Sequence, residues 1–161
     1  MNILPELINS YKQALCCIDN YKDDTLDLSS IEFLYPTSIA ILSLFIKSNK
    51  PKRIIFHNED VLQYFHVIMY GNVSNSKTYI PFIELSENQY NYDTKNNEVY
   101  NAIRAWSGNI YEPLYYIINE LRSNVDDHAR HTNAYVLAQY YPKRRFVEVA
   151  IIDDGIGIPN S

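Results

Sequence analysis

The chain has 161 residues, 47% of them hydrophobic and 20% charged, which is typical of a folded globular protein and unlike a disordered one. Its formal net charge of -5 argues against non-specific binding to nucleic acid or to an anionic membrane, because both attract a basic protein face. No apolar run approaches the roughly 18–20 residues that a membrane-spanning helix needs. We therefore expect neither nucleic acid nor membrane among its partners.

The only cysteines, Cys16 and Cys17, are adjacent in the sequence. Neighbouring cysteines can form only a strained disulfide, so we expect both thiols to be free, as in a reducing compartment where cysteine acts as a small apolar residue. The first ten residues lack the basic and apolar regions of a signal peptide. These features together predict a cytoplasmic protein.

The first half alternates helical and extended patterns. Pro36 suits the first turn of a helix, Asn58 is a good N-cap for another, and Gly71 would end that helix. The predicted elements are helices over Leu4–Ile18, Pro36–Ser48 and Glu59–Tyr70, and strands over Leu26–Leu28, Arg53–Phe56 and Tyr79–Leu85. This order predicts an α/β unit with a small mixed or parallel sheet covered by helices.

A polar, Asn-rich stretch without apolar periodicity follows, and it predicts a linker. We expect a first unit at residues 1–86, a linker at 87–98 and a second unit at 99–161. The second unit is predicted to contain helices over Val99–Trp106 and Pro113–Ala129 and strands over Ala134–Tyr141 and Phe146–Ile152, with a turn at residues 142–144.

The long helix of the second unit carries polar residues at regular spacing. Glu120, Asn124 and Asp127 are four and three residues apart, so they share one flank of an apolar stripe. The predicted members of that stripe are Leu114, Ile117, Ile118, Leu121 and Val125. A carboxylate and an amide one turn apart suit a Mg²⁺ ion, which prefers oxygen ligands, or an activated water. The alternative is an ordinary wet helix face, and His128 is better explained by packing than as a metal ligand.

The last predicted strand ends in a second polar pattern. It delivers Asp153 at its end, and Gly155 and Gly157 would then let the backbone approach a ligand closely. A carboxylate there can accept a hydrogen bond from an exocyclic amine such as that of a purine. The alternative is a plain turn, because Asp-Gly is a common turn sequence.

Taken together, E-L-x-x-N-x-x-x-H-A on a helix and D-x-G-x-G at a strand end resemble the Bergerat-fold ATPases. This histidine-kinase-like (GHKL) family includes histidine kinases, DNA gyrase B, mismatch-repair and chaperone ATPases, and anti-sigma-factor serine kinases. The resemblance covers about Tyr111–Pro159. It implies a two-layer α/β ATP-binding fold with ATP and Mg²⁺ as ligands.

The same resemblance implies a role for each matching residue. Asn124 would hold Mg²⁺, and Glu120 would be the catalytic residue that orients or deprotonates a water or a substrate hydroxyl. Asp153 would bind the adenine amino group, Gly157 would lie against the base, and Asp127 would lie near the base or ribose.

The chain departs from this family pattern after Pro159. It ends at Ser161, before the mobile lid and the second glycine-rich box that would hold the phosphates. Because phosphoryl transfer depends on such positioning, we expect these 161 residues alone not to hydrolyse ATP efficiently. The chain would then be a fragment or a shortened relative, and a second copy could cover the exposed strand edge as a homodimer.

The first unit, over about Thr25–Leu85, resembles a STAS domain, the fold of anti-sigma-factor antagonists. In those proteins the turn before the second helix carries D-S-[ST]-G with a phosphorylated hydroxyl, whereas this chain has Tyr35-Pro36-Thr37-Ser38. The departure favours a STAS-like unit without the switch, used for packing or for binding a partner, although phosphorylation of Thr37 or Ser38 stays an alternative. An unrelated small α/β unit is the other interpretation.

Two functions follow from these patterns. The first is an ATP-binding regulatory protein with a regulatory protein partner, of the anti-sigma-factor serine/threonine kinase type or a related switch. The second is a non-catalytic interaction or dimerisation module that no longer binds nucleotide. A sensor histidine kinase is disfavoured, because no helix bearing a phospho-acceptor histidine precedes the Asn124 motif.

Overall fold

The computed structural model describes residues 3–71, 78–85, 99–108, 111–128 and 133–155, with the backbone alone for residues 125–128. Within these ranges the chain is a mixed α/β protein with two separate sheets. The elements are α1 (Leu4–Asp19), β1 (Thr25–Asp27), α2 (Pro36–Asn49), β2 (Arg53–Ile55), α3 (Glu59–Tyr70), β3 (Tyr79–Leu85), a helix at residues 99–107, α5 (Tyr111–His128), β4 (Ala134–Tyr141), the 3-10 turn η3 (Pro142–Arg144) and β5 (Phe146–Asp153). The expected linker at 87–98 lies outside the described residues.

The first half contains the smaller sheet. β1 and β2 pair in parallel, with Leu26 opposite Ile54, and helices α1 to α3 share a core with them. The third strand expected in this sheet, Tyr79–Leu85, is not part of it, so the predicted three-stranded sheet of the first unit is wrong. The described sheet has two strands, and β2 has a neighbour on one side only.

Strand β3 belongs instead to the larger sheet, whose strand order is β3-β4-β5 with antiparallel pairing throughout. β3 lies at the edge of that sheet. Pro81 is tolerated in an edge strand because the position of its missing N–H can face away from the ladder. The register between β3 and β4 shifts between Ile80 and Ile83, on either side of Pro81. Although β3 was assigned to the unit at 1–86, its hydrogen bonds tie it to the sheet of the second half.

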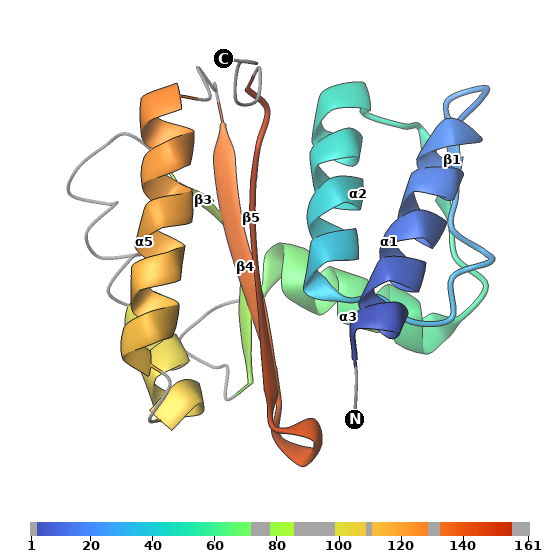
Figure 1. Ribbon diagram of the computed structural model, residues 1–161. Coiled ribbons are helices and arrows are strands. Elements are labelled where there is room, and N and C mark those ends of the chain that lie inside the picture. The colour runs from blue at the N-terminus through green and yellow to red at the C-terminus, as the bar shows by residue number, and fades with distance from the viewer. Residues whose placement is uncertain (1–2, 72–77, 86–98, 109–110, 129–132, 156–161) are drawn as a thin grey trace.

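The larger sheet is covered on both faces (Figure 1), with α1 to α3 on one side and α5 on the other. Successive residues of a strand point to opposite faces, and β4 serves two cores in this way. Leu137 packs in the core of the first half together with Ala150 of β5, whereas Val136 and Ala138 pack in the core beneath α5. The larger sheet thus lies between α5 and the helices of the first half, with α1 and the β1–β2 pair beyond α2.

Two further expectations concern compartment and redox state. Cys16 and Cys17 are both free thiols, and burial raises the pKa of Cys17. Among the described residues, no helix combines the length and the apolar character needed to cross a membrane.

Candidate functional site

Helix α5 carries the first part of the predicted site and packs on the sheet through one narrow side. Ile118 is buried and Leu114 is half-buried, and both belong to the core that contains Val136. The helix at residues 99–107 completes this core with Val99 and Ile103. The sequence alone predicted this anchoring through its helical period.

The rest of the predicted apolar stripe does not face the core. Ile117 is 53% exposed and Leu121 is 49% exposed, so the expectation that both are buried is wrong. The physical reason is that α5 packs against only a three-stranded sheet and one short helix. These elements bury the side of α5 that carries Leu114 and Ile118 and leave the other sides in water. Nothing is described of the side chain of Val125.

The polar residues of α5 lie beside these exposed apolar ones. Glu120 and Asn124 are both exposed, one turn apart, and each has an exposed apolar residue three positions before it, Ile117 and Leu121. Among the described residues neither Glu120 nor Asn124 has a hydrogen-bond or ion-pair partner. The side chains of Asp127 and His128 lie outside the description, so their predicted roles stay predictions.

The end of β5 carries the second part of the site. Asp153 lies opposite Ala134 in the ladder, and its Oδ1 accepts a hydrogen bond from the backbone N–H of Gly155 at 2.8 Å. The next residue, Asp154, accepts hydrogen bonds from the backbone N–H and the side-chain amide of Asn133, both at 2.8 Å. The turn is therefore fixed at two points, and the second oxygen of Asp153 has no partner among the described residues. Gly157 lies outside the described residues.

The fold brings the two parts of the predicted site to the same end of the sheet. In Figure 1, the C-terminal end of α5 and the C-terminal end of β5 lie at the top of the molecule, on neighbouring layers. The start of β4 lies between them in the chain and pairs with the end of β5, since Ala134 is opposite Asp153. The helix that carries Asn124 and the strand that carries Asp153 thus end at the same end of the sheet.

The chemistry of these groups fits a nucleotide with Mg²⁺. An exposed amide oxygen on Asn124 can take one place around the ion, which usually keeps several waters and binds phosphate oxygens rather than an all-protein cage. In the described ranges, no group of three His, Cys, Asp or Glu side chains gathers as metal ligands. The available oxygen of Asp153 can accept a hydrogen bond from an amine.

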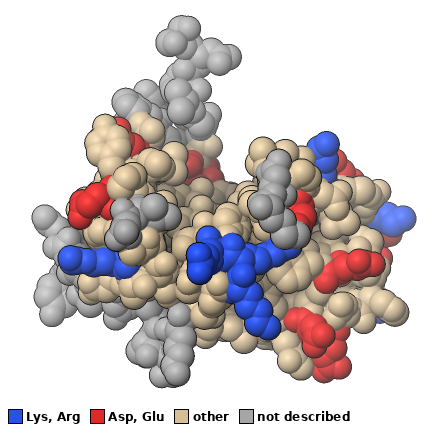
Figure 2. Space-filling view, turned by 60° about the horizontal axis from the view of Figure 1, so that its bottom comes forward, with Lys and Arg blue, Asp and Glu red and all other residues tan. Residues whose placement is uncertain are grey.

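At the opposite end of the sheet, the fold forms a cavity of about 900 Å³ that the sequence patterns did not predict. It lies between α1, the loop before α2 and the β4–β5 turn, and its walls combine amides, aromatic rings and charged groups. Figure 2 looks toward this end, where basic side chains gather in the middle of the face and acidic ones lie on either side, more of them to the right. The polar lining includes Glu6, Asn9, Gln13, Tyr35, Gln139, Lys143 and Arg144.

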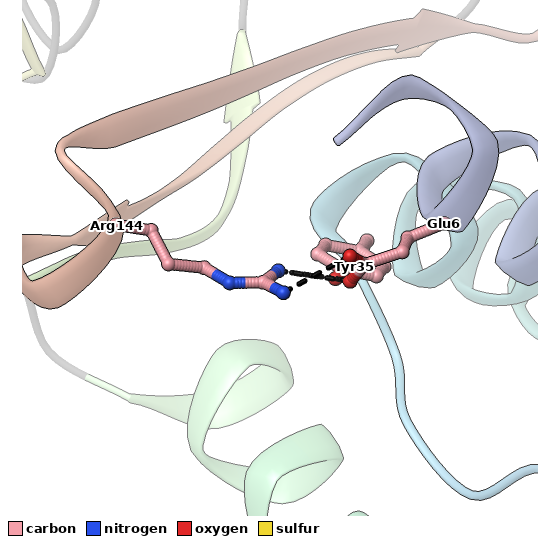
Figure 3. Close-up of polar contacts among 3 residues, drawn as sticks. All are labelled: Glu6, Tyr35 and Arg144. Atoms are coloured by element: carbon pink, nitrogen blue, oxygen red, sulfur yellow. Dashed lines mark hydrogen bonds and ion pairs between the residues drawn. The ribbon is translucent and has the colours of Figure 1, made fainter. Parts of the chain in front are cut away.

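Three residues tie the walls of this cavity together (Figure 3). The guanidinium of Arg144 donates to both carboxylate oxygens of Glu6, at 2.9 and 3.0 Å, and to the hydroxyl of Tyr35 at 3.0 Å. Tyr35 in turn donates to Glu6 at 2.7 Å. The hydrogen bonds from Arg144, and then that from Tyr35, hold the pKa of Glu6 below its ordinary value. The pKa of Tyr35 is raised, by burial first and by Glu6 second.

The hydroxyls considered as phosphate acceptors are both engaged. Ser38 is fully buried and shares a hydrogen bond of 2.7 Å with Ser10. Thr37 is exposed, but its hydroxyl donates to Glu148 of β5 at 2.7 Å. The buried position of Ser38 argues against its phosphorylation in the folded chain.

The sequence predicted the turn at residues 142–144, which contributes two basic residues to the lining, but it did not predict the cavity beside that turn. The other residues of the cavity come from segments up to 138 positions away, as in the pair of Glu6 and Arg144, and no local pattern predicts such a contact. No protein-family model matches this chain, and no match is found among the curated proteins or among the solved structures. The case for a function therefore depends on the groups at the two ends of the sheet.

Proposed function

We propose that this protein is an ATP-binding regulatory protein of the histidine-kinase-like type, with a STAS-like unit in its first half. The observation that supports the proposal is that α5, which carries Asn124, and β5, which carries Asp153, end at the same end of the sheet. Glu120 and Asn124 have no partner among the described residues, which supports the proposal because ligand-binding groups must be free to bind.

In this proposal each group has one task. The available carboxylate oxygen of Asp153 accepts the adenine amino group, while Gly155 leaves room for the backbone to pass close to the base. Asn124 holds Mg²⁺, and Glu120, one turn earlier, orients a water or a substrate hydroxyl. The exposed Ile117 and Leu121 give the apolar contact that a base or ribose needs beside these polar groups.

The packing of the first half supports a regulatory role. Its core includes Leu137 and Ala150 from the strands of the sheet, and α2 lies on β5. A ligand that shifts the end of β5 would therefore act on the helices of the first half through direct contacts rather than through a linker alone. We infer that a regulatory protein partner would be recognised by this half of the molecule.

Binding of Mg·ATP, Mg·ADP and AMP, measured by calorimetry and thermal unfolding, tests the proposal. A nucleotide at about 100 times its dissociation constant should add about 2.7 kcal/mol to the free energy of unfolding. For a chain of this size that shift corresponds to roughly 5–10 °C in melting temperature. Asp153→Asn should remove the shift, whereas Glu112→Gln, at the far end of α5, should keep it. Failure of all three nucleotides at millimolar concentration contradicts the proposal.

One observation favours a second function, that of an interaction or dimerisation module. Tyr116 is 65% exposed on α5, and with Ile117 and Leu121 it leaves much apolar surface in water. Light scattering on the wild-type chain and on Leu121→Glu separates the two functions. A dimer that Leu121→Glu converts to monomers, together with no effect of nucleotide, would favour the interaction module.

A further inference from the structure

The outer edge of β2 is open. In a parallel pair, alternate residues of a strand direct both backbone groups to the same neighbour. The N–H of Arg53 donates to Asp24 and the carbonyl of Ile55 accepts from Leu28, so these two residues of β2 bond toward β1. Ile54, between them, directs its N–H and its carbonyl away from β1. No described strand pairs with that side.

A groove of about 400 Å³ runs along this edge, between β2 and α3. Leu62, His66 and Tyr70 follow one another at four-residue spacing, so one face of α3 forms one wall. The other wall is residues 53–56, and Phe56 packs on Phe65 with ring centroids 5.6 Å apart. Tyr70 is 73% exposed, so the groove carries apolar surface with no cover among the described residues.

The charge of the groove is basic. Arg53 is exposed and has no ion-pair or hydrogen-bond partner for its side chain within the described ranges, whereas its neighbour Lys52 is paired with Asp24. No aspartate or glutamate lines the groove, and its other titratable side chains are His66 and Tyr70. Asp27 of β1 is near enough for Arg53 to help lower its pKa, but it does not line the groove. A ligand that brings a carboxylate would therefore meet a cation without a direct partner and no acidic side chain on the walls.

We propose that the groove binds an extended peptide segment of a partner protein, with an acidic side chain for Arg53 and apolar side chains at alternate positions, which pairs as an added strand with Ile54. Strand addition uses main-chain hydrogen bonds for affinity and side-chain pockets for specificity, and an edge strand beside a helix supplies both. A second copy of this chain fits less well, because its β2 edge would bring another Arg53 and no carboxylate.

Selection from a random heptapeptide library displayed on phage, with the full chain as bait, tests the proposal. We expect enriched sequences to alternate apolar residues and to contain aspartate or glutamate. Synthetic versions with a fluorescent label then give dissociation constants by anisotropy. A library that yields no enrichment over the empty support overturns the proposal.

Two charge reversals examine the role of Arg53. Arg53→Glu should weaken binding of the selected peptide at least about tenfold, because an attraction becomes a repulsion. Lys12→Glu changes the net charge equally on an exposed site of α1 outside the groove, and it should leave the affinity within about twofold. If both variants lose the same affinity for the peptide, the loss comes from the change in net charge, and the contact assigned to Arg53 is contradicted.

Hydrogen exchange separates strand addition from simple occupation of the groove. The amide of Ile54 should exchange at least about tenfold more slowly when the peptide saturates the chain. The amide of Ile55, which faces β1, should change little. An unchanged exchange rate at Ile54 overturns strand addition. Slow exchange at Ile54 without peptide, in a chain that light scattering shows to be dimeric, would mean that a second copy occupies the edge and would also overturn the proposal.

Discussion

The carboxylate of Glu148 on β5 accepts two hydrogen bonds from Thr37, one from its backbone N–H at 2.9 Å and one from its hydroxyl at 2.7 Å. Thr37 lies in the first turn of α2, where the N-cap residue Tyr35 makes no side-chain cap. A negative charge near the N-terminus of a helix is favourable because the exposed N–H groups and the helix dipole are positive there. The helix of one half is thus capped by the sheet of the other, 111 residues away.

This cap makes the stability of the protein depend on pH. Burial raises the pKa of Glu148 above its ordinary value of 4.5, against the smaller opposing effect of the hydrogen bonds from Thr37. The folded state therefore holds this proton more tightly than the unfolded state, so the contribution of Glu148 to the free energy of unfolding falls as pH rises from 4.5 through the raised pKa. Glu148→Gln keeps an acceptor oxygen and removes the ionisation.

We expect Glu148→Gln to gain stability relative to the wild type as pH rises from about 4.5 to about 7, measured by urea unfolding at both values. Glu84→Gln, on an exposed position of β3, serves as the control and should show no such trend. A Glu148→Gln variant that follows the wild-type pH profile would contradict the raised pKa assigned to this buried carboxyl.

The contact between Arg144 and Glu6 gives a second prediction. Because the hydrogen bonds from Arg144 are the main cause of the lowered pKa of Glu6, Arg144→Met should move that pKa upward, toward its ordinary value. An NMR titration of the side-chain carboxyl carbon of Glu6 measures the change directly. Lys143→Met, which removes the neighbouring charge, should move it less. A Glu6 midpoint that is the same in the wild type and in Arg144→Met would show that the pair does not form in solution.

The hydroxyls of Tyr141, which lines the cavity, and of Tyr64 should contribute differently to stability. Among the described residues the buried hydroxyl of Tyr141 has no well-aligned hydrogen-bond partner, although it lies near the hydroxyl of Tyr64, so Tyr141→Phe should be neutral or should stabilise the fold by up to about 1 kcal/mol. The hydroxyl of Tyr64 donates to Oε1 of the buried Gln139 at 3.3 Å. Tyr64→Phe should therefore cost about 1–3 kcal/mol, since Gln139 loses a partner. Urea unfolding of both variants compares them, and equal destabilisation would contradict the pairing.

Two glycines are required for different reasons. A Cβ on Gly71 would lie 2.3 Å from the carbonyl oxygen of Val67, so Gly71→Ala should cost about 1–3 kcal/mol through steric displacement at the end of α3. A Cβ on Gly108 meets nothing within 4 Å, but its φ of +51° disfavours other residues by roughly 1–2 kcal/mol. Asparagine tolerates that conformation, so Gly108→Asn should recover stability relative to Gly108→Ala, and Gly71→Asn should not.

The local elements were predictable because their signals are local. Asn58 and Gly71 bound α3 as predicted, and the side chain of Asn58 accepts hydrogen bonds from the first turn of that helix. β3 and β4 also have the predicted bounds, while β1 and the helix ends differ by one or two residues. Alternating side chains and helix caps depend only on a few neighbouring residues, so the sequence of each element is enough to predict it.

Strand pairing was not predictable in the same way. The pattern of Tyr79–Leu85 predicts a strand but does not say which neighbour it joins, and we placed it in the sheet of the first unit when it pairs with β4. The candidate site also has parts that local sequence predicts and parts that it does not. The positions of Asp153 at a strand end and Asn124 on a helix followed from sequence, whereas the cavity at the other end depends on contacts between distant segments.

The pairing of β3 with β4 has a consequence for biosynthesis. Ile80 meets Ala138, so about fifty residues must leave the ribosome after β3 before its partner exists. During that interval the first half can form α1, α2 and the β1–β2 pair, but α2 lacks its cap and β3 has no ladder. Such a nascent chain exposes an apolar strand, which is the kind of segment that ribosome-associated chaperones protect from aggregation. Release of β4 and β5 would then complete both halves in a single late step.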